Sequence, residues 1–136
     1  MRKVLFSIFA GTLILVGCSK DGGSGSASIV GTWTVNKVTS QIYLNSVLAG
    51  SDTTTTGSVE FDSNGNFTSI DSVDNTTGTY NYNSSTKELT VFVSGGDTSH
   101  ATITSLTAHN LHFTQDETQI SGATTVRVTS DADYSR

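Results

Sequence analysis

The chain has 136 residues, with seven Lys and Arg against twelve Asp and Glu, a formal net charge of −5 and a single cysteine. An acidic chain without clustered Lys or Arg lacks the surface that phosphate binding requires, so we expect no nucleic-acid partner. One cysteine excludes an internal disulfide and a cysteine-based metal site.

Residues 1–17 have the features of a secretory signal peptide. A basic start, MRK, precedes residues 4–16, which are mostly apolar. That stretch is too short for a membrane-spanning helix, which needs about twenty residues. Residues 15–18, LVGC, resemble a bacterial lipobox. The resemblance implies that a diacylglyceryl group is attached to the Cys18 thiol, that the chain is cut before Cys18, and that the new amine is acylated.

Cys18 is therefore the predicted attachment point to a membrane. Two or more acyl chains give stable anchoring, so we expect a cell-envelope protein that is lipid-anchored to the outer membrane and faces the periplasm or the surface. Residues 18–28 comprise this cysteine and a Gly/Ser-rich tether, SKDGGSGSAS, which spans about 17 Å as flexible coil. The alternative is an uncleaved anchor helix with an incidental cysteine.

Residues 29–136 are long enough for one domain with a modest core. After the predicted cleavage, Thr and Ser make up about a third of the residues, and the chain contains no proline. Short β-prone runs alternate with turn signals, and no window keeps a helical period. This pattern predicts an all-β sandwich or barrel.

About eight strands are expected in chain order. Alternation is clear where Leu89, Val91 and Val93 flank Thr90 and Phe92, which is typical of a half-buried antiparallel strand. Asn45-Ser46 is expected to turn the first strand into a short arm, 47–48, before a polar stretch at 50–55. The expected strands are 32–44, 57–62, 66–70, 78–82, 88–93, 100–106, 111–115 and 124–129.

The connections between these strands are short and rich in turn-forming residues. Residues 62–65 (DSNG) and 94–97 (SGGD) contain residue types that tolerate a positive φ. Sequential hairpins form a meander, and a meander of about eight strands avoids exposed edges best by closing into an up-and-down antiparallel barrel. A β-sandwich is the alternative.

Four motifs resemble the lipocalin-like domains of Bacteroidetes lipoproteins. They are G-x-W at 31–33, F-x-x-x-G-x-F at 61–67, G-x-Y-x-Y at 78–82 and a late I-x-x-L-T…L hairpin at 103–111. Together they span most of residues 30–113. The resemblance implies a lipocalin-like barrel in which Gly31, Trp33 and Gly65 hold structural positions. Trp33 would pack across the closed end, and the arginine that covers it would be Arg127.

The same resemblance implies a small apolar or amphipathic ligand at the open end of the barrel. Tyr80, Tyr82 and Phe92 are the candidate ligand-binding residues, because aromatic-lined cavities with few polar groups are the usual form of such sites. The same rings could instead fill the barrel, since eight strands enclose little more than their own side chains.

No catalytic or metal-binding set is predicted. The chain has three histidines, His100, His109 and His112, and no carboxylate lies at a convincing ligand spacing from them. No G-x-S-x-G elbow is present, and nothing pairs two carboxylates as general acid and base. We therefore expect no enzyme, no cofactor and no metal.

The predicted function is non-catalytic binding of a small ligand by a lipid-anchored envelope protein. The alternative is a structural or interaction module that meets another protein or a glycan. It would use the Thr/Ser-rich outer face or the segment 44–56. The sequence makes no prediction of the oligomeric state.

Overall fold

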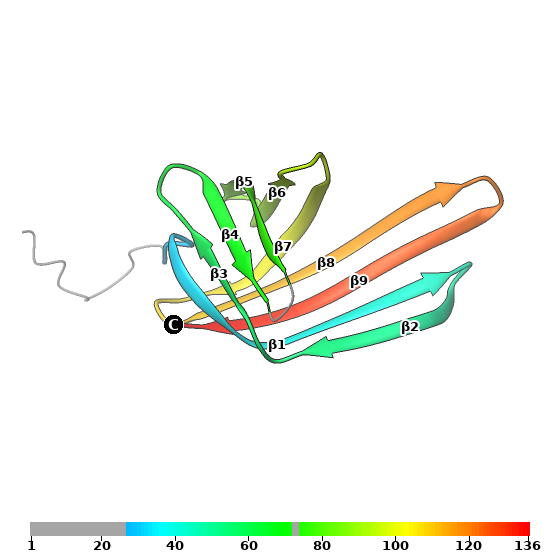
Figure 1. Cartoon of the computed structure of the whole chain (residues 1–136), viewed down its shortest axis with the longest axis horizontal. Coiled ribbons are helices and arrows are strands. Elements are labelled where there is room, and N and C mark those ends of the chain that lie inside the picture. The colour runs from blue at the N-terminus through cyan, green and yellow to red at the C-terminus, as the bar shows by residue number, and fades with distance from the viewer. Residues whose placement is uncertain (1–26, 72–73) are drawn as a thin grey trace, which may run out of the picture.

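The computed structural model describes residues 27–71 and 74–136, which form nine strands and no α-helix. From β3 to β9 each strand pairs antiparallel with the next, and β9 pairs back onto β1 to close the sheet (Figure 1). The predicted all-β antiparallel barrel is confirmed. The strands are Gly31–Leu44 (β1), Val47–Thr54 (β2), Ser58–Phe61 (β3), Asn66–Ile70 (β4), Asn75–Asn83 (β5), Glu88–Val93 (β6), Thr98–Leu106 (β7), Asn110–Ser121 (β8) and Thr124–Ser135 (β9).

Strands β2 and β3 lie end to end along the same edge of β1. Residues 31–34 of β1 pair with β3, whereas residues 38–44 pair with β2. The closed ring therefore contains eight strands, β1 and β3 to β9, and β2 lies outside it. Nothing in the described part of the chain is a helix that could span a lipid bilayer.

The core follows the alternation of side chains along the strands. On β3, Val59 and Phe61 are buried and the intervening Glu60 is exposed. Burying a large aliphatic or aromatic side chain stabilises the fold by about 1.5–3 kcal/mol. The barrel is held by one such cluster, whose buried members are Ile29, Trp33, Val59, Phe61, Phe67, Leu89, Ile103 and Leu111.

The β3–β4 turn is built by Asp62 and Gly65 of the F-x-x-x-G-x-F motif. Oδ1 of Asp62 accepts the backbone N–H groups of Asn64 (2.8 Å) and Asn66 (2.9 Å), and Gly65 has a φ of 86°. Hydrogen bonds from the side chain and backbone of Asn66 lower the pKa of the Asp62 carboxyl. This turn fixes the register in which β3 and β4 pair.

The two ends of the barrel differ. Trp33 lies at the end formed by the β3–β4, β5–β6 and β7–β8 turns, and we call it the closed end. The opposite, open end is formed by the start of β3, the end of β4, the start of β5 and the β6–β7 turn.

Beyond the open end, two hairpins continue as a four-stranded extension that we call the projecting sheet. It consists of residues 38–44, 47–54, 115–121 and 124–130 from β1, β2, β8 and β9, and it runs far past the other strands (Figure 1). Strands β8 and β9 are longer than predicted from the sequence, and most of the polar stretch 50–55 belongs to β2. Asn45 joins the two hairpin tips, since its N–H donates to the Thr125 carbonyl at 2.8 Å.

Candidate functional site

The barrel contains a cavity of about 190 Å³ between its core and its open end. Its floor is made by Val59, Phe61, Phe67 and Leu89, all of which belong to the buried cluster. Adjacent strands bring them together, since Phe61 pairs with Phe67 across β3 and β4. The floor is therefore wholly apolar, and the closed end lies behind it.

The rim of the cavity is polar. Ser69 is the last residue but one of β4, Thr76 is the second residue of β5, and Ser99 is the second residue of β7. Nε2 of Gln115 donates a hydrogen bond to Oγ of Ser99 at 3.2 Å. An apolar pocket with a few polar groups at its mouth suits a ligand that is apolar at one end and polar at the other.

Tyr134 and Phe113 form one wall of the cavity. Their rings are stacked, with centroids 5.4 Å apart and planes 19° apart. Burial raises the pKa of the Tyr134 phenol to about 12, because the phenolate would lose its hydration.

We expect this burial to make the stability of the fold fall between pH 10 and pH 12. Below about pH 10 the Tyr134 phenol is protonated in both states, so its contribution is complete. As pH rises from about 10 to about 12, the unfolded state loses the proton first, which favours unfolding. Urea unfolding at several pH values should show this loss in the wild type and a smaller loss in Tyr134→Phe. Equal slopes in both proteins would contradict it.

The three aromatic residues predicted to bind ligand do not line this cavity together. Tyr80 and Tyr82 face inward but pack against the core, and the Tyr80 hydroxyl donates to the Asp62 carbonyl at 2.7 Å. The Tyr80 ring contacts Phe61 edge-on, with centroids 4.9 Å apart. Phe92 lies on the outer face and is 46% exposed, because Val91 and Val93 on either side of it face inward.

Trp33 seals the closed end, and its covering arginine is Arg136 rather than the predicted Arg127. The indole is fully buried, and its Nε1–H donates to the carbonyl of Ile29 at 2.8 Å. The Arg136 guanidinium lies 4.0 Å from the centroid of the Trp33 ring and donates to the carbonyls of Val30 (2.6 Å) and Ala108 (2.8 Å). The guanidinium therefore ties the start of β1 to the β7–β8 turn over the ring.

Gly31 makes this cover possible. Its φ is 134°, and a Cβ at this position would lie 2.5 Å from an Arg136 nitrogen. A side chain there would displace the guanidinium from the carbonyl groups that it binds. The G-x-W motif thus combines a buried indole with a neighbour small enough to admit the arginine.

Arg127 lies instead on the outer face of the projecting sheet. Its Nε donates to Asp116 at 2.7 Å, and its guanidinium carbon is 5.8 Å from the Tyr43 ring. The hydrogen bond from Arg127 lowers the pKa of the Asp116 carboxyl. Both side chains are about half exposed, so this pair adds little to stability. Arg127 was placed wrongly because no motif fixes its position along β9.

The inner face of the projecting sheet continues the inner face of the barrel and carries an apolar strip. In the β1–β9 register, Ile42 pairs with Val128 and Leu44 pairs with Val126. Ile42 and Leu44 are 44% and 43% exposed. On β9 the strip begins beyond Ala132, which is buried in the barrel on the same face, and continues through Val128 and Val126 toward the tip of the projecting sheet.

The histidines lie outside the cavity. Nδ1 of His100 is 3.8 Å from Glu88, in a wide polar groove of the outer face, and His109 contacts the backbone of Arg136. His112 faces two carboxylates of β9, Asp131 and Asp133, a grouping that was not predicted from the sequence. The available signal was the D-x-D pattern at 131–133, which puts two carboxylates on one face of a strand.

A family model described as a lipocalin-like domain matches residues 29–113. Searches of curated proteins and of solved structures found no significant match. The matched region covers more than half of the chain, so the chain belongs to the lipocalin-like domain family. The match ends within β8, and both Arg127 and Arg136 lie beyond it.

Proposed function

We propose that this lipocalin-like barrel is a non-catalytic binder of a small apolar or amphipathic ligand, held in the cell envelope by acyl chains on Cys18. The observation that carries the binding role is the cavity of about 190 Å³ with an apolar floor and a polar rim. Among its described lining residues, Tyr134 is the one titratable side chain, and none is a histidine, an aspartate or a glutamate. This lining supports binding rather than catalysis.

The cavity volume limits the size of the ligand. An apolar cavity of about 150 Å³ binds benzene in another protein, and ligand pockets commonly enclose about 300–1,000 Å³. A cavity of about 190 Å³ therefore suits a single ring or the end of a chain. The remainder of a longer ligand would leave through the rim, where Ser99 and Gln115 offer hydrogen bonds.

Toluene tests the cavity, since it is apolar and matches this size. We expect toluene to raise the melting temperature of the purified protein, because a ligand that binds only the folded state stabilises it. Ser99→Leu should place a branched side chain at the rim and weaken binding by about 1–3 kcal/mol, where each 1.4 kcal/mol is tenfold.

The matched control for Ser99→Leu is Thr102→Leu on the same strand. Thr102 is exposed on the outer face, where it pairs with Glu88 and Thr114. We expect it to leave toluene binding unchanged. If both variants bind toluene as tightly as the wild type, the cavity is not the ligand site.

The anchoring half of the proposal rests on the sequence alone, because Cys18 and residues 1–17 lie outside the described residues. We expect Cys18→Ala to release the protein from the membrane fraction, since the thiol that would carry the acyl group is gone. Fractionation followed by immunoblotting measures this release, and Ser19→Ala is the control. A Cys18→Ala protein that stays as firmly in the membrane fraction as the wild type would refute lipid anchoring.

An interaction module is the second candidate function, and the projecting sheet favours it. Strand β2 pairs with β1 and with no other described strand, so one of its edges is free. Val47 and Leu48 on this strand are 68% and 51% exposed. Exposed apolar residues beside a free edge are a common feature of protein contacts.

A further inference from the structure

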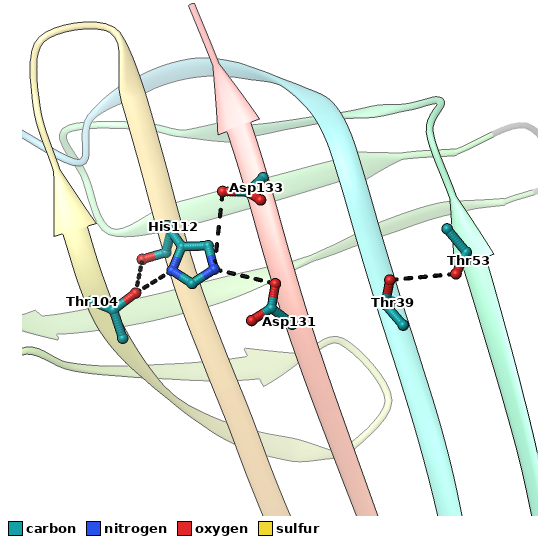
Figure 2. Close-up of polar contacts among 6 residues, drawn as sticks. All are labelled: Thr39, Thr53, Thr104, His112, Asp131 and Asp133. Carbon is teal, nitrogen blue, oxygen red and sulfur yellow. Dashed lines mark hydrogen bonds and ion pairs between the residues drawn. The ribbon is translucent and has the colours of Figure 1, made fainter.

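Three side chains with metal-binding atoms converge on the outer face of β8 and β9. Nε2 of His112 lies 3.2 Å from a carboxylate oxygen of Asp131 and 3.9 Å from one of Asp133 (Figure 2). All three ligand atoms lie within 4.8 Å of one another. The sheet geometry creates this grouping, because His112 pairs with Asp133 across the strands and Asp131 is two residues away on the same face.

Thr104 orients the His112 ring toward these carboxylates. Thr104 faces outward because it follows the inward-facing Ile103, and a bulge between Ile103 and Ser105 places both Thr104 and Ser105 opposite His112. The Thr104 oxygen contacts both the His112 carbonyl and Nδ1 of the ring (Figure 2). Nε2 forms a hydrogen bond with Asp131, and because an ionised carboxylate can only accept, Nε2–H is the donor and the Thr104 hydroxyl donates to Nδ1. A metal ion bound here would replace the Nε2 proton, and Nδ1–H would then donate to the Thr104 oxygen.

The Asp131 and Asp133 carboxylates lie close to each other and to the His112 ring, and no positively charged side chain of the described residues pairs with them. Two carboxylates and a ring nitrogen repel one another unless a proton or a metal ion lies between them. Among the described residues, no Lys or Arg lies within ion-pair distance of Asp131 or Asp133. Lys37 pairs with Asp133 in the β1–β9 register but forms no such ion pair.

We propose that His112, Asp131 and Asp133 bind a divalent transition-metal ion such as Zn²⁺. Zinc bonds to nitrogen and oxygen ligands are about 2.0–2.2 Å long, which puts neighbouring ligand atoms about 3.3–3.6 Å apart in tetrahedral coordination. The distances from His112 Nε2 to the two carboxylates, 3.2 Å and 3.9 Å, lie on either side of this spacing, and small rotations of the exposed aspartate side chains would bring both to it. Water completes the coordination, since His112 is 27% exposed and both aspartates are more than half exposed.

The ligand types select among metal ions. An imidazole ligand suits Zn²⁺, Ni²⁺ and Cu²⁺, whereas Mg²⁺ and Ca²⁺ prefer oxygen ligands alone. Most metal-binding histidines form a hydrogen bond through the ring nitrogen that does not bind the metal. Thr104 is that partner for Nδ1 of His112. This site is separate from the barrel cavity, so its test does not depend on the ligand proposed above.

Calorimetric titration of the purified full-length protein with ZnCl₂ tests the site. We expect one saturable site that His112→Ala removes and that Asp131→Asn weakens. Thr104→Val keeps the side-chain shape but removes the hydroxyl, and it should weaken zinc binding about tenfold. The matched control is His100→Ala, because His100 faces a single carboxylate, Glu88, at 3.8 Å; it should bind zinc as the wild type does.

The possible outcomes separate the proposed site from other zinc binding. Zinc binding that survives both His112→Ala and Asp131→Asn would come from another group, such as the exposed His109, and would overturn the proposal. Equal affinity for Mg²⁺ and Zn²⁺ would also overturn it, because it would show diffuse attraction to carboxylates. Circular dichroism of each variant checks the fold. Asp131 is 62% exposed, so Asp131→Asn keeps the test valid if His112→Ala does not fold.

Discussion

Replacing Trp33 with alanine should lower the free energy of unfolding by about 3–5 kcal/mol. The indole is fully buried, and its removal leaves a cavity at the closed end. The Ile29 carbonyl loses its hydrogen bond, and the Arg136 guanidinium loses the ring that it covers. Urea unfolding followed by circular dichroism measures the change without the tryptophan signal that the variant lacks.

The control for Trp33→Ala is Ile120→Ala in the projecting sheet. Ile120 is 76% exposed, so we expect its replacement to change stability by less than about 0.5 kcal/mol. If Trp33→Ala costs less than about 1 kcal/mol, the indole does not seal the closed end in solution.

Replacing Gly78 with alanine should be the most disruptive addition of a single methyl group. A Cβ at Gly78 would lie 2.0 Å from the Phe92 carbonyl oxygen and 2.7 Å from the Phe67 ring. The carbonyl belongs to the β5–β6 pairing and cannot move without breaking it. We therefore expect a loss of about 1–3 kcal/mol or more, measured by urea unfolding.

Gly50 provides a matched comparison for Gly78. It lies on β2, and a Cβ there would meet no atom within 4 Å. Gly50→Ala should therefore leave stability within about 0.5 kcal/mol of the wild type. Equal effects of the two substitutions would show that the close approach of β5 and β6 at Gly78 is absent in solution.

The sequence predicted the barrel strands well where a turn signal bounds an alternating run. Strands β4 and β6 have the expected bounds, 66–70 and 88–93. Strand β8 was expected to end at residue 115, because its projecting half is largely polar. Strand β9 was expected only over 124–129, where Val126 and Val128 alternate with Arg127, and its barrel half, 130–135, was missed because it is mostly polar. Their length comes from pairing with each other and with β1, which is a long-range effect.

The residues of the candidate site were harder to predict, because the sequence does not show how deep in the barrel an inward-facing side chain lies. The inward direction of Tyr80 and Tyr82 follows from alternation, but their packing onto the core below the cavity depends on how the strands are staggered. Leu89, Val91 and Val93 alternate along β6 and face the barrel interior, so Phe92 between them could have been placed on the outer face. Arg136 covers Trp33 although no motif surrounds it, so the sequence offered no signal for it.

We propose above that the barrel binds an apolar ligand in the cavity next to Phe61 and Leu89. Nuclear Overhauser effects between toluene and methyl-labelled protein test it most directly, because they locate the bound ligand. We expect contacts from toluene to the methyl groups of Val59, Leu89 and Val91, which line the cavity. Contacts confined to Val126 and Val128 on the projecting sheet, or no contacts at saturating toluene, would contradict it.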